Sequence, residues 1–130
     1  MSDDSAATTI SDAESYVMEV LWRSSSPLPA EDVIAALIET QSWKTATVKT
    51  LLNRLLKKGA IAAQEDGRRF LYHAVLKREE WLARESDGLL KRLFGGRIAP
   101  LVAHFGSQRK LSQADIAELR KLIDEFDDGK

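Results

Sequence analysis

The sequence contains no cysteine, only two histidines and no long apolar run. Without cysteine the chain can form neither a disulfide nor a thiolate metal site, and it cannot sense redox state through a thiol. This composition fits a reducing cytoplasm, which is where we expect the protein to act. No segment approaches the roughly 20 apolar residues that a membrane helix needs, so no membrane association is expected.

The histidines and glycines form no pattern that is typical of an enzyme. His73 and His104 lie far apart in the sequence, and no third ligand stands near either, so no metal site is expected. Gly95-Gly96 predicts a break between helices and does not resemble a phosphate-cradling loop such as G-x-G-x-x-G. We therefore expect no catalytic residues and no cofactor.

The net charge of −1 conceals an uneven distribution of charge along the chain. Residues 1–40 carry one basic residue against eight acidic ones, whereas residues 41–78 carry nine basic residues against two acidic ones. The remaining residues are close to balanced. A local positive excess is the electrostatic footprint of a segment that binds phosphate, so it indicates a nucleic acid partner.

Helical patterns occupy the chain after a polar tail, residues 1–9, that we expect to be flexible. Ser11-Asp12-Ala13-Glu14 is a capping-box sequence and predicts the start of a first helix. Its expected buried stripe consists of Ala13, Val17, Val20 and Leu21. A second helix is predicted over residues 30–39, and a third over residues 45–58, ended by Gly59.

The third predicted helix has two chemically different faces. The apolar stripe consists of Val48, Leu51, Leu52, Leu55 and Leu56, which recur at helical spacing. The opposite face carries basic and hydrogen-bonding side chains but no acid. Most such faces touch only water, but here the basic excess of the region and the neighbouring elements favour contact with DNA.

A strand pair is predicted directly after the third helix. Residues 61–65 and 68–75 are the strands, and Asp66-Gly67 is the expected turn. Three helices followed by a hairpin is the order of a winged helix-turn-helix. The fold class that we expect is mainly α with a small β-hairpin, in which residues 10–76 form an N-terminal winged-helix DNA-binding domain.

Three further amphipathic helices are predicted over residues 77–130. Three short amphipathic helices cannot bury their apolar stripes alone, so we expect this C-terminal three-helix domain to pair two copies of the chain in a homodimer. The alternative is that the stripes fold back onto the winged helix of the same chain. The residues expected at the dimerisation surface are Leu82, Leu89, Leu90, Leu93, Phe94, Leu101, Val102, Phe105, Ile116, Leu119 and Ile123.

Several segments resemble the penicillinase and methicillin-resistance repressors, the BlaI/MecI family. The resemblance is most specific in the middle of the chain and extends over residues 10–123. The segments that carry it are Thr47-Val48-Lys49-Thr50-Leu51-Leu52-Asn53-Arg54-Leu55, Lys58-Gly59, Gly67-Arg68-Arg69-Phe70-Leu71-Tyr72, Leu93-Phe94-Gly95-Gly96, Leu101-Val102-Ala103-His104-Phe105 and Leu111-Ser112.

The resemblance implies a homodimeric repressor that binds a palindromic operator and blocks transcription. It also implies induction through a membrane sensor of β-lactams and a linked protease, which cuts the repressor in its dimerisation region. The family's cut lies between an asparagine and a phenylalanine, and the matching pair here is His104-Phe105. Histidine thus replaces the asparagine at the position that matches the cleavage site.

The expected DNA-binding residues belong to two groups. Those in the first half of the third helix are placed to meet base edges. Residues placed to hold phosphates are Lys49, Asn53, Arg54, Lys57 and the two arginines near the turn. The full set is Lys44, Thr45, Ala46, Thr47, Lys49, Thr50, Asn53, Arg54, Lys57, Arg68 and Arg69. Trp43 is expected either at the DNA or in the core.

Two other functions remain open at the level of sequence. Winged helices also serve as docking modules for proteins, and the acidic first helix could face such a partner. The acid-free face of the third helix argues against this adaptor function. A repressor of the same family that answers a signal other than a β-lactam is the second alternative.

Overall fold

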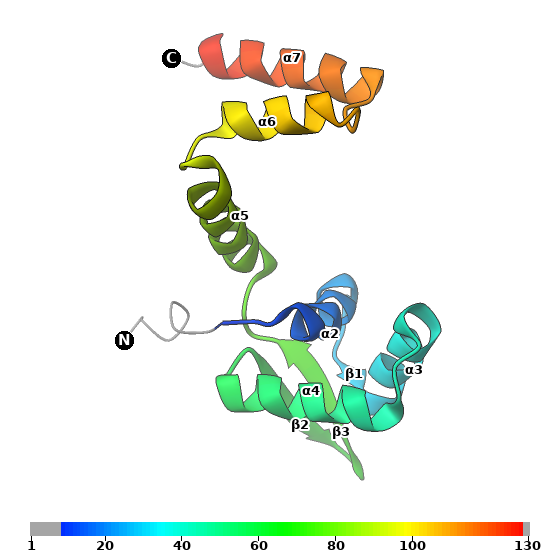
Figure 1. The fold of residues 1–130 in the computed structure, drawn as a ribbon. Helices are drawn as coiled ribbons and strands as arrows, with labels where there is room; N and C mark the ends of the chain where they lie inside the picture. The colour runs from blue at the N-terminus through cyan, green and yellow to red at the C-terminus, as the bar shows by residue number, and fades with distance from the viewer. Residues whose placement is uncertain (1–8, 129–130) are drawn as a thin grey trace. The chain divides into compact units, whose positions relative to one another are not determined.

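The computed structural model describes residues 9–128, which form six helices and one small sheet (Figure 1). The tail predicted over residues 1–9 lies, apart from Thr9, outside the described residues. The chain divides between Trp81 and Leu82 into two compact units, which are described separately below. The elements, in chain order, are α2 (Asp12–Arg23), β1 (Leu28–Pro29), α3 (Ala30–Gln41), α4 (Thr45–Lys58), β2 (Ile61–Asp66), β3 (Arg69–Ala74), α5 (Arg78–Phe94), α6 (Ile98–Ser107) and α7 (Gln113–Asp128).

Helix α2 begins at the predicted capping box. The Ser11 hydroxyl accepts a hydrogen bond from the Glu14 amide at 3.1 Å, and the Glu14 carboxylate accepts one from the Ser11 amide at 2.9 Å. The expected stripe of this helix needs a correction. Met18 is fully buried, whereas Val20 is only partly buried, because the core lies on the Val17–Met18 side of the helix.

Helices α3 and α4 follow each other closely, as in a helix-turn-helix. Helix α3 runs two residues further than predicted, to Gln41, and its C-cap Ser42 adopts the left-handed conformation with φ of 59°. Helix α4 has the predicted bounds, Thr45–Lys58. Gly59 at its C-cap has φ of 79°, a conformation that glycine adopts without steric cost.

The sheet has one strand more than the predicted hairpin. Leu28–Pro29 forms β1, which pairs antiparallel with β3, so the strand order is β1-β3-β2. The turn also differs by one residue, because Asp66 pairs with Arg69 and the two turn residues are Gly67 and Arg68. Gly67 has φ of 67°, which suits glycine at the first central position of a two-residue hairpin turn. The helices and the sheet together confirm the winged-helix fold.

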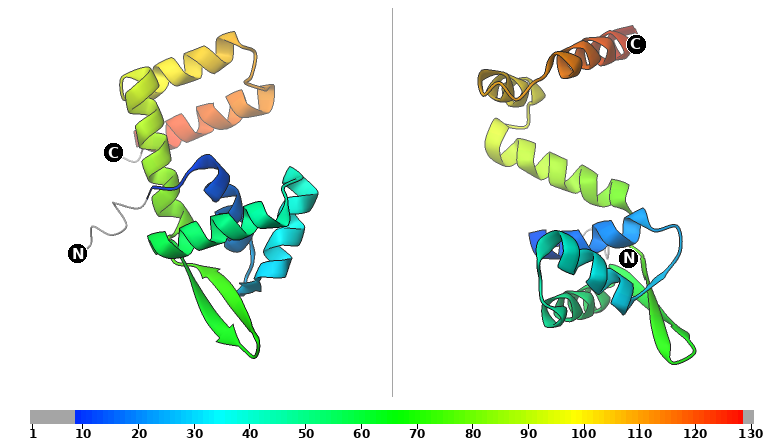
Figure 2. Two further views of the ribbon diagram at one scale, coloured as in Figure 1. Left: turned by 60° about the horizontal axis from the view of Figure 1, so that its bottom comes forward. Right: turned by 90° about the vertical axis from the view of Figure 1, so that its right-hand side faces the viewer.

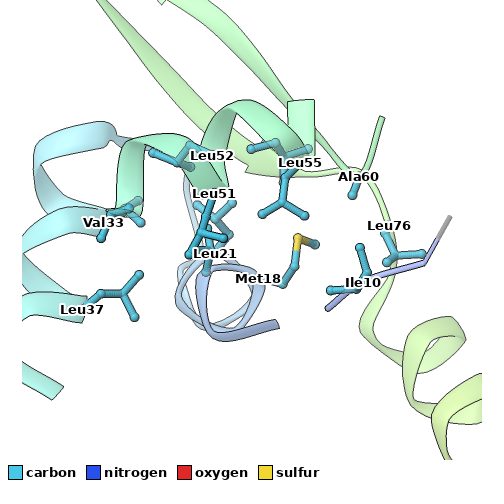
Figure 3. Close-up of a cluster of buried hydrophobic side chains, with 13 residues drawn as sticks. Ile10, Met18, Leu21, Val33, Leu37, Leu51, Leu52, Leu55, Ala60 and Leu76 are labelled. Atoms are coloured by element: carbon cyan, nitrogen blue, oxygen red, sulfur yellow. The ribbon is translucent and has the colours of Figure 1, made fainter. Parts of the chain in front are cut away.

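All three helices of the first unit contribute to its core. Met18, Val33 and Leu55 are completely buried, and Figure 3 shows Met18 and Leu55 pointing toward each other. Ala60 and Leu76 line the cluster where the chain enters and leaves the hairpin. Each large apolar side chain that is fully buried stabilises the fold by about 1.5–3 kcal/mol. This core holds α4 with its apolar face inward.

The second unit consists of α6, α7 and α5 beyond Trp81. Gly95 and Gly96, with φ of 61° and 77°, separate α5 from α6, as predicted. The Ser112 hydroxyl accepts a hydrogen bond from the Asp115 amide at 3.0 Å and caps the start of α7. None of the residues of these three helices is buried, although each helix is amphipathic. The second unit therefore has no closed core within one chain.

Candidate nucleic-acid interface

Helix α4 presents its polar face to solvent over its whole length. The buried side chains Val48, Leu51, Leu52 and Leu55 hold the opposite face against the core. Every residue that the sequence predicts for DNA contact on this helix is exposed. These residues are Lys44, Thr45, Ala46, Thr47, Lys49, Thr50, Asn53, Arg54 and Lys57.

The cations of this polar face have no carboxylate partners in the described part of the chain. Among residues 9–128, the ion pairs include none with Lys49, Arg54 or Lys57. Their charges are thus free to attract a polyanion, and no local carboxylate must first be displaced.

The N-terminus of α4 lacks the negative groups that usually stabilise a helix start. Its N-cap is Lys44, no side chain caps the first turn, and that turn contains no acidic residue. Helices α2 and α7, by contrast, begin with serine caps and acidic residues. The positive end of the α4 dipole and the Lys44 charge therefore add to the same positive potential.

The hairpin tip of β2 and β3 projects beyond the helices of the first unit in each view (Figure 2). Arg68 is exposed and, in the part of the chain that the structure covers, makes no ion pair. Arg69 differs, because it pairs with Asp66 at 3.5 Å and with Glu31 at 3.8 Å. The prediction treated the two arginines alike, whereas the structure leaves only Arg68 without a carboxylate neighbour.

Trp43, for which the sequence left two locations open, packs against the core of the first unit. Its ring meets that of Tyr16 edge-on, with the centroids 5.7 Å apart. The aromatic contact joins the loop before α4 to helix α2. Trp43 therefore helps to place the start of α4.

An ion pair that the sequence did not predict ties α4 to α2. The Lys58 ammonium lies 2.5 Å from the Glu14 carboxylate, which is only 2% exposed, and it also donates to the Thr9 carbonyl at 2.6 Å. The sequence predicts for Glu14 only its place in the capping box. Glu14 lies at helical spacing from Val17, Met18 and Leu21, so this acid falls within the apolar stripe of α2. Its position in that stripe is the sequence signal for a buried charge that needs a partner.

The surroundings of Glu14 favour its charged form. Burial by itself would raise the pKa of Glu14, but hydrogen bonds from Lys58 and from the Ser11 amide and hydroxyl, with the Lys58 charge, lower it below its ordinary value. A carboxyl whose pKa is lowered by folding adds stability above its ordinary pKa of 4.5. That contribution is lost as the pH falls through the lower pKa of the folded state.

Replacement of Lys58 by methionine is expected to leave the Glu14 carboxylate buried without its cation. We expect the free energy of unfolding at neutral pH to fall by about 2 kcal/mol. This loss is smaller than that for breaking a fully buried ion pair, because Lys58 is partly exposed. The loss should shrink on acidification, since a protonated Glu14 no longer needs a cation. Urea unfolding at neutral pH and at a pH below 4.5, the ordinary pKa of the carboxyl, with Lys57→Met as the matched control, measures this, and a loss independent of pH would contradict it.

The predicted dimerisation residues are exposed or partly buried in the single chain. Leu93 and Ile123 are the most exposed of them, at 61% and 59%, and Leu82, Leu89 and Phe105 are also exposed. The other six are partly buried. Three helices thus carry apolar stripes that their own unit leaves accessible.

His104 and Phe105, which the sequence resemblance predicts as a cleavage position, lie inside α6. The His104 ring is 5.4 Å from that of Phe105 and 6.2 Å from that of Phe94, measured between centroids. A protease binds its substrate as an extended strand, so access to this peptide bond would require α6 to unwind locally.

No helix in residues 9–128 has both the length and the apolar character needed to cross a membrane.

Comparison with known proteins connects this geometry to a family. Residues 10–125 match the family model described as the penicillinase repressor. The penicillinase repressor of Bacillus licheniformis is 35% identical over 121 residues, which span 93% of this chain and 94% of that protein.

Two solved structures resemble the first part of the chain. The DNA binding domain of the repressor BlaI is 38% identical and matches with a TM-score of 0.52 over 56% of this chain and 88% of that domain. Bacillus licheniformis BlaI in its monomeric form, in complex with the blaP half-operator, is 40% identical, with a TM-score of 0.50 over 55% of this chain and 87% of that one. The match of the family model over nearly the whole chain shows that this protein belongs to the penicillinase repressor family.

Proposed function

We propose that this protein is a transcriptional repressor that binds double-stranded DNA as a homodimer on an inverted-repeat operator. The observation that carries the proposal is the exposed, acid-free face of α4, whose cations Lys49, Arg54 and Lys57 have no carboxylate partners in the described residues. The complex of the related BlaI with a half-operator supports the proposal. Binding of the repressor at a promoter blocks access of the transcription machinery.

Helix α4 is the recognition helix in this proposal, and its N-terminal half enters the major groove. The side chains there are small or hydrogen-bonding, as in Thr45, Ala46 and Thr47, and the methyl groups of alanine and threonine suit contact with a thymine methyl. Lys49 and Thr50 lie one turn further along the same helix, and Lys49 contacts a phosphate. Arg54 and Lys57, near the other end of the helix, hold phosphates, as does Arg68 at the hairpin tip.

The homodimer is supported by the exposed stripes of α5, α6 and α7. None of their residues is buried in one chain, so a second copy is the economical cover for apolar side chains such as Leu93 and Ile123. We propose residues 10–76 as the DNA-binding domain and residues 77–130 as the dimerisation domain.

The proposed sorting of roles is tested with two substitutions on one helix. Thr47→Ala is expected to reduce discrimination between operator and random duplex, with little change in salt dependence, because it removes a base contact. Arg54→Ala is expected to weaken both duplexes alike and to reduce the slope of log K against log salt by about 0.9 per protomer. Fluorescence anisotropy over a range of salt concentrations measures both effects. Identical behaviour of the two variants would refute the assignment of roles.

A further inference from the structure

The segment that follows the hairpin is fastened to the winged helix on two sides. The amides of Val75 and Leu76 both donate to the Ala60 carbonyl, at 2.8 and 3.0 Å. The Leu76 carbonyl accepts a hydrogen bond from the Trp22 indole of α2 at 2.9 Å, and the Leu76 side chain is only 5% exposed. The chain therefore does not leave the hairpin as a loose connection.

The first turn of α5 is in turn held against α2. The rings of Trp22 and Trp81 lie with their centroids 5.4 Å apart, and both side chains pack against the core. One turn earlier, the Arg78 guanidinium pairs with the Glu19 carboxylate at 3.3 Å. All of these contacts lie within the first unit, which extends to Trp81. We call Glu19, Trp22, Arg78 and Trp81 the α2–α5 joint.

A flexible tether would not need such a joint. Linkers between domains are usually exposed, polar stretches that few contacts cross, whereas here the connection continues directly into a helix of 17 residues. The joint combines a ring contact and an ion pair on the first turn of α5, and its Trp22 indole also donates a hydrogen bond to the Leu76 carbonyl, just before that turn. These contacts hold the first turn of α5 on the winged helix.

We infer that the α2–α5 joint is a positioning device that sets the separation of the two half-sites that a dimer recognises. This inference rests on the proposed dimeric repressor. Two linked binding modules gain affinity when the length of their connection matches the distance between the two DNA half-sites. If the connection is stiff, this gain in affinity falls sharply when the distance between the half-sites changes. A loosened joint should therefore weaken binding at the correct spacing and tolerate wrong spacings better.

The experiment measures binding of the full chain to duplexes that differ only in spacing. The duplexes are the inverted repeat that the wild-type protein selects from random sequences, the same repeat with two or five base pairs inserted at its centre, and a single half-site. The joint variants are Trp81→Ala and Arg78→Ala. Lys77→Ala is the matched control for Arg78→Ala, because it removes the same charge from an exposed neighbour.

Trp81→Phe keeps an aromatic ring in the joint and serves as the conservative variant. It replaces the indole by a smaller phenyl ring, and the N–H that is lost is buried without a hydrogen-bond partner in the described residues, so it should preserve wild-type spacing preference. Thermal unfolding and sedimentation accompany each titration. They show whether a variant is folded and whether it is still a dimer under the conditions of the binding measurement.

We expect wild type, Lys77→Ala and Trp81→Phe to bind the native spacing at least about 10-fold more tightly than the two-base-pair insertion. Trp81→Ala and Arg78→Ala should lose most of this preference while they bind the half-site within about twofold of wild type. A loss that is equal on half-site and full repeat, or an unchanged spacing preference in folded, dimeric variants, would overturn the inference. Absence of binding to any duplex by the wild type would instead refute the proposed function itself.

Discussion

Replacement of Lys49, Arg54 and Lys57 together by glutamine is expected to weaken binding to a half-site duplex about 500-fold at about 0.1 M salt. Each cation that neutralises a phosphate releases counterions, so each contributes about 0.9 to the slope of log K against log salt. The slope should fall by about 2.7 for one protomer and by about twice that for a dimer on a full operator. The loss should be similar for operator and random duplex, because phosphate contacts carry no sequence information.

The control for this triple variant removes the same total charge elsewhere. Lys110, Arg120 and Lys121 are exposed residues of the second unit, outside α4 and the hairpin. Their replacement by glutamine should leave the half-site slope unchanged, since these residues contact no phosphate in the proposed complex. Equal effects of the two triple variants would mean that net charge, not the surface of α4, determines binding.

Replacement of Leu93 and Ile123 together by glutamate is expected to make the protein monomeric at micromolar concentration. Both side chains are about three-fifths exposed in the single chain, at 61% and 59%, so their replacement costs little in the fold of one protomer. In a dimer they would be buried, and buried carboxylates without cations oppose association strongly. Analytical ultracentrifugation measures the change in mass.

The same variant tests whether dimerisation matters for binding. Affinity for the full inverted repeat should fall by at least about 100-fold, because the second half-site is no longer bound intramolecularly. Affinity for a half-site should stay unchanged, since α4 is untouched. Ala117→Glu, at an exposed position on α7, is the control and should remain dimeric. A variant that remains dimeric despite both glutamates would contradict the proposed interface.

Local signals explain why the sequence predicted α4 so well. Its apolar stripe has helical periodicity, and Gly59 directly follows the 14 residues of the helix and marks its end. The same holds for the start of α2, where Ser11 and Glu14 interact over three residues. The exposed face of α4 followed from the stripe, because one face of an amphipathic helix determines the other.

Features that depend on contacts between distant residues were not predictable in this way. Strand β1 has only two residues, one of them proline, and it exists because Leu28 pairs with Tyr72. The Glu14–Lys58 pair joins residues that are separated by most of the winged helix. Arg69 has the same local sequence signal as Arg68, and only the fold brings Glu31 beside it.

The central claim is that the exposed face of α4, presented twice by a dimer, recognises a symmetric DNA sequence. Selection of tightly bound duplexes from a random pool by the wild-type protein, followed by titration of the selected sequence at several salt concentrations, tests it most directly. We expect an inverted repeat, bound by one dimer and at least about 1,000-fold more tightly than random duplex. Selected sequences without two-fold symmetry, or affinity equal to that for random duplex, would contradict the claim.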